Sequence, residues 1–113
     1  MKVDGNSYLA KEIIVPDAGQ IKYRVVVAGN EIEAEIALSA LKHGKTVEDI
    51  LSALEHCIYD ETIVAEPNKT LVVGFDVATN LTEVISHVLS EEEIVVFHAM
   101  PCRKKYLEKA MAR

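Results

Sequence analysis

The second half of the chain is a succession of β-prone runs separated by short turn sequences, and this feature restricts the fold most strongly. The runs are rich in β-branched and aromatic residues, and the segments between them read PNK, VATN and SEEE. The four runs cover residues 62–66, 70–76, 81–89 and 94–100. Short connections favour antiparallel neighbours, so we expect a four-stranded antiparallel meander.

The first half of the chain changes its hydrophobic period at Asn30. The runs 12–15 and 20–29 are β-prone and predict an N-terminal arm or edge hairpin. After Asn30, the apolar residues Ile32, Ile36, Leu38 and Leu41 follow at helix-like intervals up to Gly44. A second helix is predicted from Thr46, which has Asp49 at the capping-box position and is followed by a stripe formed by Val47, Ile50, Leu51, Leu54 and Ile58. This half therefore predicts a helical hairpin.

Pro101 closes the last β-prone run and suits the first position of a helix, because its fixed φ fits there and no N–H is required. The last strand should thus lead directly into a C-terminal helix. The expected fold class is α+β, with the arm or hairpin, the helical hairpin, the meander and this helix in chain order. The 113 residues suit a single domain, with residues 1–29 as the arm and 30–113 as the core.

Cellular location is inferred from the cysteines and the apolar runs. Cys57 and Cys102 have no paired spacing and the chain lacks a secretory signal pattern, so we expect a cytoplasmic protein with free thiols. No apolar run approaches the length that crosses a bilayer, which predicts no membrane partner.

Charge is distributed unevenly along the chain. The net charge is −6, yet residues 98–113 carry five Lys or Arg and one Glu, against seven and seventeen in the remainder. Arg103, Lys104 and Lys105 fall in the predicted first helical turn, where the helix dipole disfavours cations. Two explanations stay open, namely a localised anion site and a basic helix packed beside acidic neighbours.

The order of these elements resembles a known family. LKHGKTVEDILSAL, KTLVVGFDVATNLTEVISHVL and IVVFHAMPCRKKYLEK, within residues 36–109, are similar to the BrnT-like toxins of bacterial type II toxin–antitoxin systems, relatives of the RelE/ParE ribonuclease fold. The matching features are the basic-His-Gly signature at Lys42–Gly44, Gly74 in the meander, and the Arg/Lys-rich final helix. The resemblance implies a metal-independent ribonuclease that inhibits translation, with RNA and a protein antitoxin as partners. A homodimer is a further expectation, because an acidic body and a basic end are complementary.

Metal-independent RNA cleavage needs an acid, a base and fixed cations. His98 can titrate near neutral pH, and Arg103 can hold a phosphate through two N–H groups. Tyr106 and His43 complete the expected catalytic set, His43 on the resemblance alone. The expected RNA-binding or phosphate-binding residues are Lys42, Lys104, Lys105 and Lys109.

Other chemistries fit the sequence less well. His56, Cys57, His98 and Cys102 lack the spacing of a zinc site, so neither a metal nor a cofactor is expected. A nucleophilic cysteine is disfavoured, although Cys102 near a helix N-terminus should have a lowered pKa. The alternative function is a non-catalytic protein-interaction module on the same fold, an inactive or repurposed toxin homologue, since the chain is acidic and has an N-terminal extension beyond the family pattern.

Overall fold

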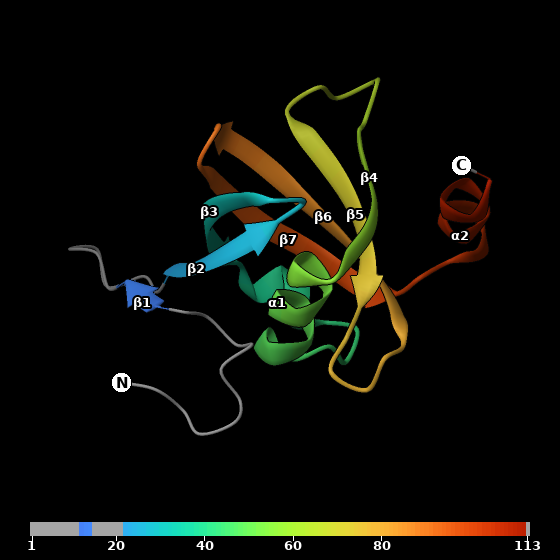
Figure 1. The fold of residues 1–113 in the computed structure, drawn as a ribbon, viewed down its shortest axis with the longest axis horizontal. Coiled ribbons are helices and arrows are strands. Elements are labelled where there is room, and N and C mark those ends of the chain that lie inside the picture. Colours follow the sequence, from blue (N-terminus) through green and yellow to red (C-terminus); the bar gives the residue numbers. More distant parts are fainter. Residues whose placement is uncertain (1–11, 15–21, 113) are drawn as a thin grey trace.

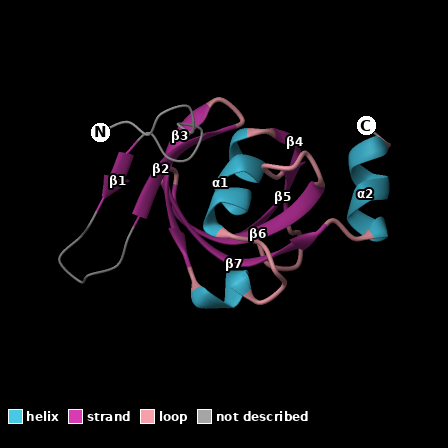
Figure 2. Ribbon diagram, turned by 90° about the horizontal axis from the view of Figure 1, so that it is seen from below, coloured by secondary structure: helices cyan, strands magenta, loops and turns pink. Residues whose placement is uncertain are grey.

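The structure, a computed structural model, describes residues 12–14 and 22–112, and in this part of the chain seven strands form one mixed sheet. The strands are β1 (Glu12–Ile14), β2 (Lys22–Val27), β3 (Asn30–Ile36), β4 (Cys57–Thr62), β5 (Lys69–Phe75), β6 (Leu81–Ser90) and β7 (Glu93–Pro101). Their order in the sheet is β1-β2-β3-β7-β6-β5-β4, with β3 and β7 parallel and the other neighbours antiparallel. The sheet curls around helix α1 (Val47–Glu55), while helix α2 (Lys104–Met111) lies outside the curl (Figures 1 and 2).

The predicted fold class is therefore wrong, and the error lies chiefly in residues 30–44. Instead of a helix, these residues form strand β3 and a short 3-10 helix, η1 (Leu38–Leu41). Ile32 and Ala34 are buried on one face of β3, so the segment follows the two-residue period of a strand. The pairing of β3 with β2 and with β7 stabilises this conformation in preference to the helix.

The predicted four-stranded meander is also wrong. The sheet has seven strands among the described residues, and the first predicted strand, residues 62–66, does not form. Residues 63–68 form a turn, and the strand before that turn is β4, which follows α1 directly. The four strands from β4 to β7 are part of a larger sheet, because β7 continues through its parallel pairing to β3. The later predicted runs coincide with β5, β6 and β7.

Helix α1 fills the hollow of the curled sheet. Its predicted capping box is confirmed, since Thr46 Oγ1 accepts from Asp49 N at 3.0 Å and Thr46 N donates to Asp49 Oδ2 at 3.1 Å. Ile50, Leu51, Ala53 and Leu54 are buried against the sheet. Gly74 of β5 lies so close to the helix that a Cβ atom there would stand 1.9 Å from the Ala53 carbonyl oxygen. Glycine is thus required for this helix–sheet contact.

A second apolar cluster lies on the opposite face of the sheet, beneath α2. Its buried members are Leu71, Val73, Ile85 and Ala110, with the partly buried rings of Phe97 and Tyr106 packed against them. Among the described residues, no helix is long and apolar enough to span a membrane.

A β-bulge in β7 determines which side chains reach this outer face. Ile85 of β6 pairs with His98, but the next residue, Ser86, pairs with Val96, so Phe97 is an extra residue. Val96 and Ala99 face α1, and both Phe97 and His98 face the outer side. The bulge thereby places two neighbouring side chains on one face.

The passage from β7 to α2 differs from the prediction. Pro101 is the last residue of β7, and α2 begins at Lys104 with Arg103 in extended conformation as its N-cap. Arg103 therefore lies at the junction between strand and helix.

Candidate functional site

The carboxylate of Glu83 is fully buried and is the centre of a polar cluster on the outer face of the sheet. Arg103 Nη2 donates to Glu83 Oε2 at 2.6 Å, and Arg103 Nε lies 3.1 and 3.0 Å from the two carboxylate oxygens. The backbone N–H of Arg103 donates to Oε1 at 2.9 Å. On the neighbouring strand, His98 Nε2 lies 2.8 Å from Oε2. One buried carboxylate thus holds a cation and an imidazole in fixed positions.

The electrostatics of the cluster favour an ionised Glu83. Burial alone would raise the pKa of its carboxyl group, but the hydrogen bonds from Arg103 and His98 outweigh this effect and hold the pKa below its ordinary value. Hydrogen bonding to Glu83 raises the pKa of Arg103 further. With neutral His98, the three groups together carry no net charge; a proton on His98 makes the cluster positive.

His43 reaches the same cluster from the turn after η1. Its ring centroid lies 5.6 Å from that of His98, in an edge-to-face arrangement. Two hydrogen bonds anchor η1 to β7 beside His98: Ser39 Oγ donates to the Phe97 carbonyl at 2.7 Å, and Ala37 N donates to the Val96 carbonyl at 2.9 Å. These two hydrogen bonds hold η1 against β7, and the turn after η1 therefore places His43 beside His98.

The basic residues from Arg103 onward do not all lie beside the Glu83 cluster. Arg103 Cζ lies 5.2 Å from the centroid of the Tyr106 ring, and Lys105 Nζ lies 4.9 Å from it, so these residues adjoin the cluster. Lys109 instead pairs with Glu61 of β4 at 3.0 Å, and Lys104 lies 3.9 Å from Glu108 on its own helix. Lys42, at the C-cap of η1, is exposed one residue before His43.

Of the eight predicted site residues, the structure groups His43, His98, Arg103, Tyr106 and Lys105 around Glu83. Sequence reasoning did not identify Glu83 as a site residue. The available signal was a carboxylate between the apolar residues Leu81 and Val84 of a β-prone run, followed by a cationic segment that could pair with it.

Cys102 does not have the lowered pKa expected from a helix N-terminus. Burial raises the pKa of its thiol, and the negative charge of Glu83 raises it further. Within the described ranges, no three His, Cys, Asp or Glu side chains gather as a metal-binding group.

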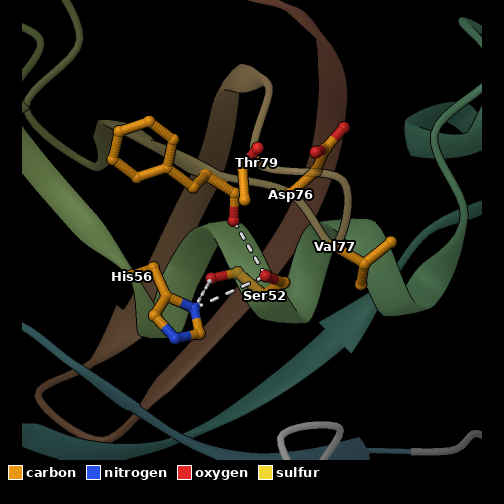
Figure 3. Close-up of a pocket in the computed structure, with 6 residues that line it drawn as sticks. Ser52, His56, Asp76, Val77 and Thr79 are labelled. Carbon is orange, nitrogen blue, oxygen red and sulfur yellow. Dashed lines mark hydrogen bonds between the residues drawn. The ribbon is translucent and has the colours of Figure 1, made fainter.

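A pocket of about 380 Å³ lies elsewhere, between α1 and the turn after β5 (Figure 3). Ser52 Oγ donates to the Phe75 carbonyl at 2.8 Å, and His56 Nδ1 lies 2.9 Å from the Ser52 carbonyl. Asp76 is buried and paired with Lys45 at 2.6 Å. We assign the candidate site to the Glu83 cluster rather than to this pocket, because two imidazoles and a guanidinium converge at Glu83.

Comparison of the chain with protein-family models, with curated proteins and with solved structures found no match.

Proposed function

We propose that this chain is a metal-independent ribonuclease of the BrnT-like toxin type. The observation that carries the proposal is the convergence of His43 and His98 beside the buried Glu83 carboxylate, which also holds Arg103. Two imidazoles can supply the base and the acid of RNA cleavage, and a fixed guanidinium can stabilise charge on the phosphate.

His98 is suited to act as the base. Its Nε2 lies 2.8 Å from Glu83, so the neutral ring carries its proton on Nε2 and has a lone pair on Nδ1. In the proposed step, Nδ1 takes the proton of a ribose 2′-hydroxyl, and the 2′-oxygen attacks the adjacent phosphorus. Glu83 stabilises the imidazolium that forms, as the carboxylate does in a catalytic triad.

His43 is suited to act as the acid. As the bond from phosphorus to the 5′-oxygen breaks, protonated His43 gives its proton to that oxygen, and the products are a 2′,3′-cyclic phosphate and a free 5′-hydroxyl. The Arg103 side chain is 41% exposed despite its bonds to Glu83, which leaves its outer side open to a phosphate oxygen. Lys105 adds positive potential beside it.

In a cell, such an enzyme would inhibit translation by cutting RNA in the cytoplasm, and a protein antitoxin would control it. An antitoxin with an acidic segment could cover Arg103 and the lysines of α2. The acidic body of a second copy offers the same complementarity, so a homodimer is the other proposed assembly. Either complex should weaken as salt rises, which light scattering at low and high salt would measure.

One observation favours a second candidate, the non-catalytic interaction module. Arg103 gives both its guanidinium and its backbone N–H to Glu83, so the cluster also fixes the junction between β7 and α2. In such a module, the same residues would serve only to position α2 for a protein partner.

The two candidates are separated by cleavage of a single-stranded RNA labelled at its 5′ end, with a chelator present. Wild-type protein should yield a 2′,3′-cyclic phosphate product, and His43→Ala and His98→Ala should each lower the rate by about 10²–10³. A wild-type protein that leaves RNA intact, with Glu83→Gln markedly lowering its melting temperature, would support the interaction module instead.

A further inference from the structure

The bulge in β7 brings Phe97 to the face that carries His98, next to a group of aromatic and cationic side chains. Phe97 precedes His98 and faces the same side of the sheet. Its ring lies 4.4 Å from that of His87 on β6, centroid to centroid, with an angle of 33° between the planes. Lys69 Nζ of β5 lies 5.2 Å from the centroid of Phe97. We call Lys69, His87 and Phe97 the aromatic platform.

Packing explains only part of this arrangement. The inner part of the Phe97 ring rests on the apolar cluster of Leu71 and Ile85. His87, however, is an exposed ring on a strand whose register pairs it with Lys69. The exposed His87 ring is thus the open part of this π-surface, while Lys69 Nζ lies over the Phe97 ring and also pairs with Glu66, in a chain with two phenylalanines and no tryptophan.

Such a combination suits single-stranded nucleic acid. Bases stack on aromatic rings whatever their sequence, and a nearby ammonium group contacts the backbone. A duplex keeps the faces of its bases inside its own stack, where a platform on a protein surface cannot reach them. The adjacency of Phe97 and His98 means that a base on the platform would belong to a nucleotide close to the phosphate held at the Glu83 cluster.

We infer that the aromatic platform is a nucleobase-binding subsite, which makes single-stranded RNA the substrate of the neighbouring acid–base centre. The inference rests on the proposed function for its RNA chemistry. A base stacks on the His87–Phe97 pair, Lys69 contacts the adjoining phosphate, and the scissile phosphate lies toward His98 and Arg103. Specificity at this subsite is for an unpaired base rather than for a particular one.

The test measures binding separately from cleavage. The probe is a short fluorescein-labelled RNA strand in which every ribose is 2′-O-methylated, because the blocked 2′-oxygen cannot attack the phosphate. Fluorescence anisotropy gives its Kd, in comparison with the same strand annealed to its complement and with a strand of abasic residues. Wild-type protein should bind the single strand more tightly than either comparison probe.

The variants remove the rings while keeping the fold. Phe97→Leu retains an apolar side chain over Leu71 and Ile85, and both Phe97→Leu and His87→Ala should weaken single-strand binding by about tenfold, with no change for the abasic strand. Val26→Ala, on distant strand β2, is the matched control and should bind as the wild type does. Equal Kd values for wild type, Phe97→Leu and His87→Ala would overturn the inference.

Failure of the ribonuclease proposal gives a different result from failure of the nucleobase subsite. Ring-dependent binding of the blocked strand, without cleavage of unmodified RNA, would support the subsite and reject the enzyme. Cleavage with kcat/KM unchanged in Phe97→Leu would support the enzyme and reject the subsite.

Discussion

Oε2 of Glu83 lies 2.8 Å from Nε2 of His98, across neighbouring antiparallel strands β6 and β7. Glu83 pairs with Met100 and Ile85 pairs with His98, so Glu83 and His98 are diagonal neighbours on one face of the sheet. The length of the glutamate side chain closes the distance between them.

Glu83→Gln should lower the free energy of unfolding by about 1–3 kcal/mol. The substitution removes the charge that binds Arg103 and His98 in a buried position, and the partial exposure of Arg103 keeps the loss below that of a fully buried ion pair. Urea unfolding would measure the change. Glu91→Gln, in the exposed turn before β7, is the control and should lie within about 0.5 kcal/mol of wild type. Equal urea midpoints for Glu83→Gln and wild type would contradict the structural role of the carboxylate.

The stability that Glu83 provides should depend on pH. Its pKa is lower in the folded protein than in the unfolded chain, so the contribution is fully present above the unfolded pKa of about 4.3 and disappears as pH falls through the folded value. The difference in unfolding free energy between wild type and Glu83→Gln should therefore shrink as the pH falls below about 4.3 and through the folded pKa of Glu83. A difference that stays constant throughout the acidic range would show that Glu83 is not the titrating group.

Arg103→Ala should lower the rate of RNA cleavage by about 10²–10³, and Arg103→Lys should recover only part of it, because lysine keeps the charge but loses the planar fork. Arg103→Ala should also lower the melting temperature, since it leaves Glu83 buried without its main partner. Lys104 is exposed on α2, and Lys104→Ala serves as the control because it also removes one cation from this region. Unchanged cleavage by Arg103→Ala would remove Arg103 from the proposed site.

Gly74→Ala should destabilise the protein by more than about 3 kcal/mol, because the new methyl group would overlap the Ala53 carbonyl and push α1 away from β5. Gly44→Ala is the matched control. Gly44 has a φ of +85° but open space around it, so alanine there should cost only about 1 kcal/mol. Thermal unfolding of both variants would compare the two effects, and a Gly74→Ala protein as stable as Gly44→Ala would contradict the close contact.

The sequence was sufficient to predict elements whose signals are local. The Thr46–Asp49 capping box depends only on neighbouring residues, and β5, β6 and β7 lie where β-branched residues are dense. Residues 30–36 were ambiguous, because Ile32 and Ile36 are spaced four apart and fit one face of a helix as well as one face of a strand. Tertiary pairing with β2 and β7 decided between them, and this information is not local.

Only part of the candidate site could be predicted from the sequence. His98 and Arg103 were identified from chemistry close together in the sequence, and His43 from a family resemblance. Glu83 could not be identified in the same way, because its importance comes from its complete burial and from its hydrogen bonds to His98 on β7 and to Arg103 after β7. The β-bulge was equally hidden, although it determines the direction of Phe97 and His98.

The parallel pairing of β3 with β7 has a consequence for synthesis of the protein. Strand β3 is made early and β7 late, so β2, β3 and α1 leave the ribosome well before the strand that joins them to the rest of the sheet. Pairing between such distant segments forms slowly, because the intervening loop must close first. Arg103 is made later still. A nascent chain would therefore lack an assembled Glu83 cluster until Arg103 has emerged, so the proposed ribonuclease would be inactive up to that point.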